Sequence, residues 1–172
     1  MAGSTVSLAM ERVMKHSNQS RTLIGGFVGT LVMTVLLYSA PSAGAPNMDI
    51  AALLGSLFGH RIPAVMTGLW WVGMMWHFIN GTIVFSLIYS YLVYDWLPGS
   101  NWFRGMIWGL ILWAGMELIL MPATGNGIFS DHTTSIFARI VGSFVLYGIY
   151  GLILGAIAGA QTEHTHHVAH PA

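Results

Sequence analysis

The sequence predicts an all-α membrane protein with four transmembrane helices and one short amphipathic helix at the membrane interface. Of its 172 residues, 55% are hydrophobic and only 7% are Asp, Glu, Lys or Arg, whereas a soluble domain usually contains about 25% of these charged residues. The apolar residues form stretches that match the roughly 20 residues needed for one helical crossing. The 21 glycines and seven tryptophans are typical of close helix packing and of anchoring at membrane interfaces.

The composition also excludes several classes of function. Without cysteine, the sequence offers no disulfide, no thiol nucleophile and no cysteine-ligated iron–sulfur cluster. The formal net charge is zero and the six cationic residues are scattered, so neither a nucleic-acid surface nor a polybasic lipid-binding patch is predicted. Four crossings use about half of this sequence, which leaves no stretch for a soluble catalytic domain. The expected partners are the lipid bilayer and either other membrane subunits or further copies of this chain.

The first part of the chain is predicted to be polar and cytoplasmic. The predicted divisions are a cytoplasmic segment (1–20), a four-helix transmembrane domain (21–160) and a flexible histidine-rich tail (161–172). The first helix is expected from about Thr22 to Ala40, with Ser20 as its N-cap and Pro41 at its end. No convincing small-residue cleavage site follows this helix, so the sequence predicts a retained helix and not a signal peptide.

A short amphipathic helix is predicted from Asn47 to Gly59. Its apolar side chains recur with helical spacing on one face, at Ile50, Leu53, Leu54, Leu57 and Phe58. The polar residues Asp49, Ser56 and His60 lie largely on the other side. Because the segment is too short to cross a bilayer, we expect it to lie in the interface.

The next apolar stretch, Pro63 to Leu97, is too long for a simple crossing, because 35 helical residues would span about 52 Å. Aromatic residues indicate where its interfaces lie. From Trp71 to Trp96 a helix would measure about 37 Å, which matches the distance between the two headgroup regions. Residues 63–70 are therefore assigned to the interfacial layer.

Two more crossings are predicted. The third helix runs from about Trp102 to Met121 and stops at Pro122. A polar loop, Ala123 to Ser135, separates it from a fourth helix that runs from about Ile136 to Ala160.

The distribution of cations predicts that both ends of the chain face the cytoplasm. With the N-terminus inside, the inner segments hold Arg12, Lys15, Arg21 and Arg104, and the outer segments hold Arg61 and Arg139. By the positive-inside rule this excess predicts a multi-pass protein of the cytoplasmic (inner) membrane, N-in and C-in.

Glycines four residues apart predict where helices approach closely. The candidate packing positions are Gly25, Gly29, Gly73, Gly81, Gly105, Gly109, Gly148, Gly151, Gly155 and Gly159. The longest run, from Gly151 to Gly159, has two interpretations. It packs inside the four-helix bundle, or it docks to a partner's helix.

Several short pieces of this sequence, in a fixed order, resemble a known family. They are Gly25 and Gly29 with Met33-Thr34, Met48-Asp49-Ile50 with Leu54-Gly55, His77-Phe78 with Gly81-Thr82, Met121-Pro122 with Gly125, Gly127 and Phe129, and Tyr147-Gly148 with Gly155. Over about residues 22–160, the chain resembles a family of small four-helix inner-membrane proteins of bacteria and archaea whose members have no assigned activity. The resemblance implies the fold and no reaction. Family members often carry a histidine near the position of Phe144, and its absence here disfavours a paired-histidine site.

Five polar residues are predicted to form a buried site within the membrane: Thr34, His77, Asn80, Glu117 and Ser143. Ionisable side chains are costly in lipid and face the interior of a bundle by default. Counted from the helix ends, His77 lies about 9 Å and Glu117 about 6 Å inside the outer surface. We therefore expect these two side chains to face each other, directly or through water. The alternative is that each side chain has its own hydrogen-bond partner and that Glu117 extends to the outer surface.

His77 has several chemical interpretations. It is a structural histidine hydrogen-bonded to the backbone or a polar neighbour, or a haem b ligand, or a metal ligand or proton relay. Gly73 and Gly81 are expected to leave room for a macrocycle. A single histidine supplies one axial ligand, so Met33, Met116 or a partner protein would supply the other. The sequence therefore predicts no cofactor, with haem b as the alternative.

The tail offers four weak metal ligands, His164, His166, His167 and His170. Imidazole suits Zn²⁺, Ni²⁺ and Cu²⁺, but nothing nearby fixes a coordination geometry. A flexible low-complexity end is the favoured interpretation.

The function predicted from the sequence is non-catalytic. No Gly-x-Ser-x-Gly elbow, Ser–His–Asp order or phosphate-binding loop is present, so no enzyme is expected. The favoured class is an accessory or assembly subunit of a larger membrane complex, of which respiratory complexes are one example. The alternatives are a small conductor or transporter of protons, metal ions or a solute, and a haem-binding electron carrier.

Overall fold

The computed structural model describes residues 2–59, 61–130 and 136–159, with side chains described from residue 19 onward except at residue 130. Four helical stretches are long and apolar enough to cross a membrane, and we number them spans one to four: Gln19–Ala43, Gly68–Trp96, Asn101–Ala123 and Ile136–Gly159. A shorter apolar helix, Ile50–Gly59, lies between the first two. The described ranges contain helices and no strand, so the predicted all-α class with four spans is confirmed.

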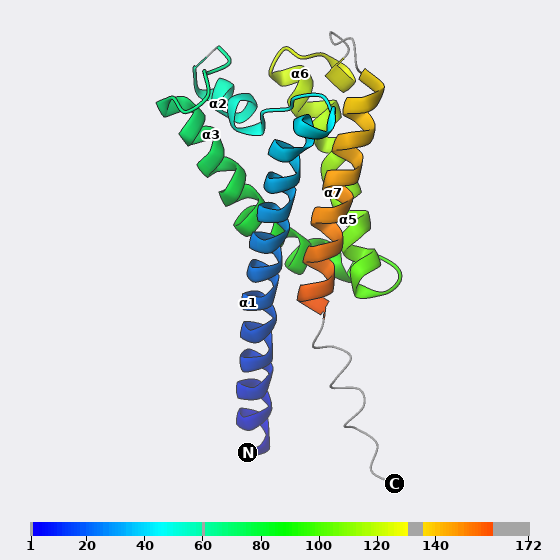
Figure 1. Ribbon diagram of the computed structural model, residues 1–172. Helices are drawn as coiled ribbons and strands as arrows, with labels where there is room; N and C mark the ends of the chain where they lie inside the picture. The colour runs from blue at the N-terminus through cyan, green and yellow to red at the C-terminus, as the bar shows by residue number, and fades with distance from the viewer. Residues whose placement is uncertain (1, 60, 131–135, 160–172) are drawn as a thin grey trace.

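Span one belongs to a long helix, α1 (Ala2–Ser39), followed by a 3-10 turn, η1 (Ala40–Ala43), that ends at Gly44 with φ of 87°. In Figure 1, α1 extends well below the other helices. The predicted start near Thr22 was wrong, because the helix begins at Ala2 and Ser20 lies inside it. Polarity marks where a chain leaves an apolar environment and does not by itself end a helix. Residues 2–20 contain no proline that would break the backbone hydrogen bonds.

The short helix α2 (Ile50–Gly59) is a wedge between α3 (Gly68–Ile79) and the other spans (Figure 1). It buries two sides. Ile50 and Leu54 belong to the main hydrophobic core, while Ala51 and Ala52 form a second cluster with Trp70 of α3. The predicted single apolar face is therefore incomplete: Leu57 and Phe58 of that face are exposed, and the opposite side is covered by α3.

Spans two and three are interrupted by π-helical turns that the sequence did not predict. Span two consists of α3, η2 (Asn80–Val84), α4 (Phe85–Ile88), η3 (Tyr89–Val93) and η4 (Tyr94–Trp96). Span three consists of α5 (Asn101–Gly115), η5 (Met116–Leu120) and α6 (Met121–Ala123). The turn η6 (Ile128–Ser130) and the fourth span, α7 (Ile136–Gly159), follow. In the π turn η2 the Gly81 carbonyl accepts hydrogen bonds from the hydroxyls of Ser86, at 3.0 Å, and Tyr150 of α7, at 2.7 Å. A backbone group freed by a π turn in an apolar span needs such a partner.

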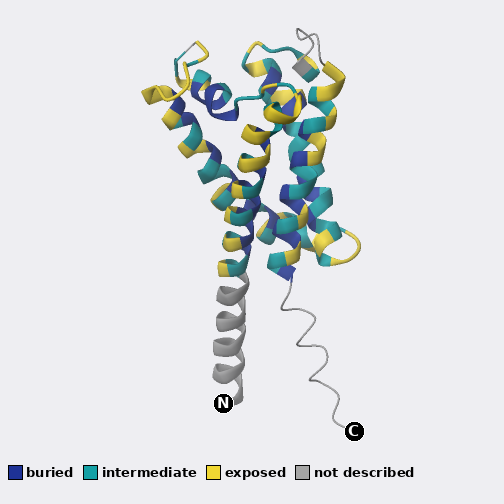
Figure 2. Cartoon of the chain, viewed as in Figure 1, coloured by how far each residue is buried: buried dark blue, intermediate teal, exposed yellow. Residues whose placement is uncertain are grey.

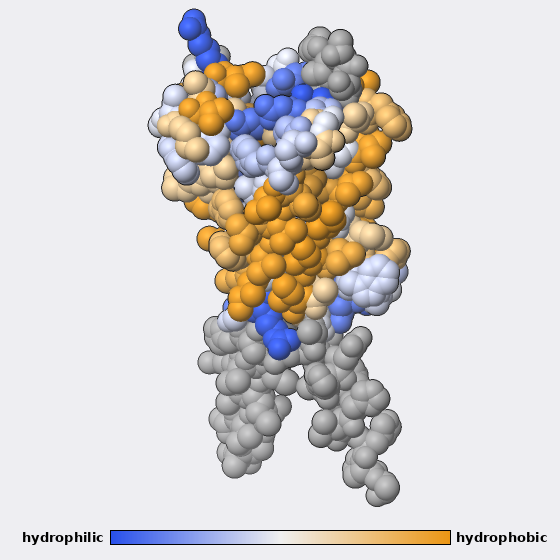
Figure 3. Space-filling view, viewed as in Figure 1, coloured by the Kyte–Doolittle hydropathy of each residue, from blue (hydrophilic) through white to orange (hydrophobic). Residues whose placement is uncertain are grey.

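The most extensive helix contacts are those of α5 with α7 and of α1 with α7. Tyr89 and Leu154 are completely buried at the centre of the molecule. Figure 2 shows buried residues where the helices meet and exposed ones along their outer sides. On the face shown in Figure 3, a broad apolar belt lies between hydrophilic side chains near both ends, as expected for helices that face lipid.

Candidate functional site within the helix bundle

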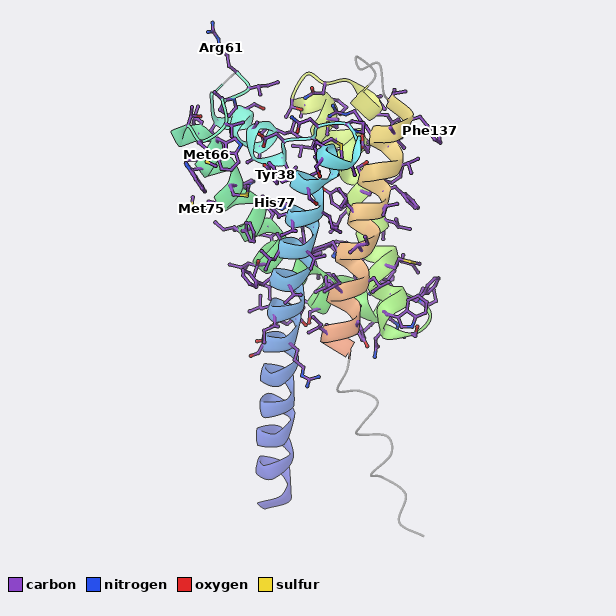
Figure 4. The ribbon with its side chains drawn as sticks, in the orientation of Figure 1. Tyr38, Arg61, Met66, Met75, His77 and Phe137 are labelled. Atoms are coloured by element: carbon purple, nitrogen blue, oxygen red, sulfur yellow. The ribbon has the colours of Figure 1, made fainter. Side chains whose placement is uncertain are left out.

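The buried polar residue His77 is bound by a hydroxyl of the neighbouring span. On α3, His77 is only 8% exposed and lies on the side toward α1 (Figure 4). Its Nε2 atom lies 3.0 Å from Oγ1 of Thr34. The Thr34 hydroxyl donates its single hydrogen to the Thr30 carbonyl, at 2.7 Å. Thr34 Oγ1 must therefore accept from His77, so Nε2 carries the proton and Nδ1 is left with a lone pair.

The direction of these hydrogen bonds determines whether His77 can act as a base toward the Thr34 hydroxyl. A catalytic base would accept the hydroxyl proton and activate the oxygen as a nucleophile. Here the hydroxyl hydrogen points to a backbone carbonyl, so His77 orients Thr34 without activating it. The pair resembles a structural histidine more than a nucleophile and its base.

Glu117 forms a second buried cluster. It is 3% exposed in the π turn η5, and its Oε1 accepts a hydrogen bond of 2.8 Å from the Ser143 hydroxyl on α7. Ser143 in turn accepts from the indole N–H of Trp113, at 3.0 Å. These three residues tie α5, η5 and α7 together at one level.

The direct contact predicted between His77 and Glu117 is not formed in the described structure. Each side chain has its own hydroxyl partner, Thr34 for His77 and Ser143 for Glu117. The cavity beside His77 and the cavity beside Glu117 have Met116 and Tyr147 as shared walls. Glu117 is buried and does not extend to the outer surface. Four of the five predicted polar residues thus form two separate pairs, and Asn80 belongs to neither, because helix rotation matters as much as depth.

A cleft of about 430 Å³ separates α3 from α5. The two helices diverge on the α2 side of the molecule (Figure 1). His77 and Asn80 are the polar residues of the cleft, apart from the Tyr147 hydroxyl, and the rest of its lining is apolar or aromatic. The described structure gives the Asn80 side chain no hydrogen-bond partner. Trp76, Ile111 and Ile119 are exposed along its rim, so the cleft opens on the apolar belt.

A second cavity, of about 210 Å³, lies between α1, α2, η5 and α7. Glu117, Asp49 and Arg139 are its charged lining residues. The Nε atom of Arg139 is buried without a hydrogen-bond partner. Four methionines also line this cavity, namely Met33, Met48, Met116 and Met121.

Haem does not fit the face on which the sequence placed it. The space beside Gly73 is filled by the backbone of α2 at Ala51, and the space beside Gly81 by the side chain of Thr30. The Nε2 atom of His77 is already engaged by Thr34. The expectation that Gly73 and Gly81 leave room for a macrocycle was therefore wrong, because small residues here bring helices together.

Most of the predicted packing glycines lie where helices meet. A Cβ atom at Gly105, Gly109, Gly151 or Gly155 would overlap the facing backbone of α5 or α7, and one at Gly159 would overlap Asn101. Gly25 and Gly29 of α1 face Leu154 and Tyr150 of α7. Gly148 differs, because nothing lies within 4 Å of the position that its Cβ would take.

Asp49 is a central residue that the sequence analysis did not single out as a site. Its carboxylate accepts hydrogen bonds from the Tyr38 hydroxyl at 2.6 Å, the Trp70 indole N–H at 2.9 Å and the Ala52 backbone N–H at 2.9 Å. It thereby connects α1, α2 and α3. An aspartate directly before an apolar helix is an N-cap signal, and this signal would have found it.

The four histidines predicted as weak metal ligands, His164, His166, His167 and His170, lie outside the described residues. Among the described residues, no group of three or more His, Cys, Asp or Glu side chains is arranged to hold a metal ion.

Residues 17–169 match a family of unknown function (DUF6789), so the chain belongs to that family. This match confirms the predicted resemblance to proteins without an assigned activity. No curated protein and no solved structure matches the chain.

Proposed function

We propose that this chain is a non-catalytic accessory or assembly subunit of a larger complex in the cytoplasmic membrane, with both ends inside. The observation that carries the proposal is Asn80, which lies near the middle of span two and lines the cleft between α3 and α5. Its amide has no hydrogen-bond partner in the described structure. An amide that faces lipid carries an unfavourable desolvation free energy, because no water is present to bind it.

A helix from another membrane protein is the occupant that this cleft fits. Polar side chains such as asparagine hold membrane helices together through hydrogen bonds across the interface. The cleft opens on the apolar belt and has apolar walls, with Asn80 and His77 among its polar lining residues. A partner's helix that carries a hydroxyl or amide side chain would bind both groups and fill the apolar walls.

A proton conductor receives less support. The two polar clusters, His77 with Thr34 and Glu117 with Ser143, are not linked by hydrogen bonds among the described residues. A haem-binding carrier is disfavoured by the filled spaces beside Gly73 and Gly81.

Two glycines provide a matched test. At Gly115 and at Gly148, no neighbouring atom of the described structure lies within 4 Å of the position of an added Cβ, so both positions have room for the first atom of a side chain. Circular dichroism and elution volume check that both leucine variants fold. Gly115 lines the cleft, whereas Gly148 lies on α7 outside it. The tagged full chain is purified from its native membrane in mild detergent, and co-purifying chains are identified and quantified.

We expect an unlike membrane chain to co-purify with the native protein and with Gly148→Leu. Its amount should fall at least tenfold for Gly115→Leu and for Asn80→Leu. Co-purification with copies of itself alone would favour an oligomeric conductor. Equal recovery of the partner with Gly115→Leu and Gly148→Leu would show that the cleft is not the docking site.

A further inference from the structure

We infer that the 210 Å³ cavity between α1, α2, η5 and α7 binds one monovalent soft metal ion, Cu(I), through methionine thioethers. This cavity adjoins the cleft beside Asn80, with Ile50, Met116 and Tyr147 lining both, but the inference does not depend on the proposed function. Four of the chain's 11 methionines line this one cavity, and they come from four different segments of the chain. Thioether sulfur is a soft ligand that selects Cu(I) over harder cations.

The π turn η5 brings two of these side chains to one side. In an α-helix, residues five apart point in different directions. In η5 the Met121 backbone N–H instead bonds to the Met116 carbonyl. Five residues therefore complete one helical turn, and Met116 and Met121 lie on the same side of the helix. Both side chains are buried, at 9% and 7% exposure. The π turn, which the sequence did not predict, therefore has a role in assembling the cavity.

Met33 and Met48 complete the set from the opposite wall. Met33 of α1 is 5% exposed and belongs to the same core cluster as Met116 and Met121, against which Met48 packs. Each methionine side chain has three rotatable bonds, so its sulfur adjusts to an ion without movement of the backbone.

The charges around the cavity also favour a single monovalent cation. Asp49 and Glu117 contribute two carboxylates, and Arg139 contributes one positive charge. Ionised, these three side chains would leave one net negative charge in the lining of the cavity. Glu117 is buried, and the one hydrogen bond that it accepts among the described residues comes from the Ser143 hydroxyl, so a negative charge at this position would be poorly compensated. A bound Cu(I) ion would balance it.

Cu(I) binding to the full-length protein tests this inference. The purified chain in detergent, kept anaerobic with a reductant, competes for Cu(I) with a chromophoric Cu(I) chelator. Because imidazole is also a copper ligand, the measurement uses a background in which His164, His166, His167 and His170 are replaced by Ala. X-ray absorption then reports whether sulfur or nitrogen surrounds the metal.

The key variant replaces Met33, Met116 and Met121 with Leu, which conserves volume and leaves the packing intact. The matched control replaces three methionines that do not line the cavity, Met74, Met75 and Met106, with Leu. Helical circular dichroism and elution volume check that both variants fold.

We expect one Cu(I) per chain with a sulfur-rich shell, an unchanged affinity in the control, and at least a hundredfold weaker binding in the cavity variant. Glu117→Gln should weaken binding about tenfold. Equal affinities in the cavity and control variants would overturn the inference, as would a nitrogen or oxygen shell around the metal. Absence of Cu(I) binding by the tail-substituted chain would do the same.

Discussion

Two hydroxyl groups provide the hydrogen-bond partners of the buried ionisable side chains His77 and Glu117. Thr34 of α1 accepts from His77, and Ser143 of α7 donates to Glu117. Both hydroxyls are small and lie on helices adjacent to the group that they bind. Their depth in the membrane was predictable from sequence, but their direction was not.

The tautomer of His77 gives the first prediction at this scale. Thr34→Val removes the acceptor for Nε2–H, whereas Thr34→Ser retains it. Loss of one hydrogen bond costs about 1 kcal/mol, which corresponds to a roughly fivefold change in the tautomer ratio. We expect nitrogen NMR of ring-labelled histidine to show protonated Nε2 in the native protein and in Thr34→Ser. Thr34→Val should show a mixture of tautomers. A native His77 protonated on Nδ1 would contradict the hydrogen-bond chain from His77 through Thr34 to the Thr30 carbonyl.

At the scale of the helices, glycine decides which faces meet. Gly105 and Gly109 of α5 lie against Gly151 and Gly155 of α7, with backbone facing backbone. Such an approach maximises van der Waals contact where lipid provides no hydrophobic driving force between helices. The longest glycine run therefore faces the chain's own α5. This contact corresponds to the interpretation that the run packs inside the four-helix bundle and does not dock to a partner's helix.

Leucine substitution on α7 gives the prediction for this scale. Replacing both Gly151 and Gly155 with Leu places side chains where the α5 backbone now lies. Because each overpacked site costs about 1–3 kcal/mol, we expect a combined loss of roughly 3 kcal/mol or more in stability. Thermal unfolding in detergent, followed by circular dichroism, measures it. Gly148→Leu on the same helix is the control and should unfold like the native protein. A native-like melting temperature for the double variant would place the Gly151 and Gly155 face in lipid.

At the scale of the whole molecule, the wedge helix α2 shapes the fold. It lies between α3 and the remaining spans, and Asp49 at its start binds groups from α1, α2 and α3. The separation of α3 from α5 leaves the cleft on one side of the wedge, and the methionine-lined cavity lies on the other. Both proposed binding regions therefore depend on a helix too short to cross a membrane.

The proposed orientation makes a prediction about the complete chain. Cysteines introduced at Ser42 and Ser130 should react with an impermeant thiol reagent added to intact cells, because both loops are proposed to lie outside. A cysteine at Ser4 should react only after the membrane is opened. The native chain contains no cysteine, so each label reports a single position. Labelling at Ser4 in intact cells would reverse the proposed topology.

The sequence by itself determined the fold class, the four spans and the short helix between the first two. Apolar length and helix-ending residues such as Pro122 are local properties, and the ends of spans two to four were predicted to within a few residues. The start of α1 was missed, because the helix continues through the polar segment that precedes the first span. Only the tertiary structure decided that His77 binds Thr34, that Glu117 binds Ser143, and that four methionines surround one cavity. These outcomes depend on the rotation and tilt of each helix, and on π turns that shift the register of side chains by one residue. Rotation, tilt and register follow from packing between distant segments, which no local pattern in the sequence encodes.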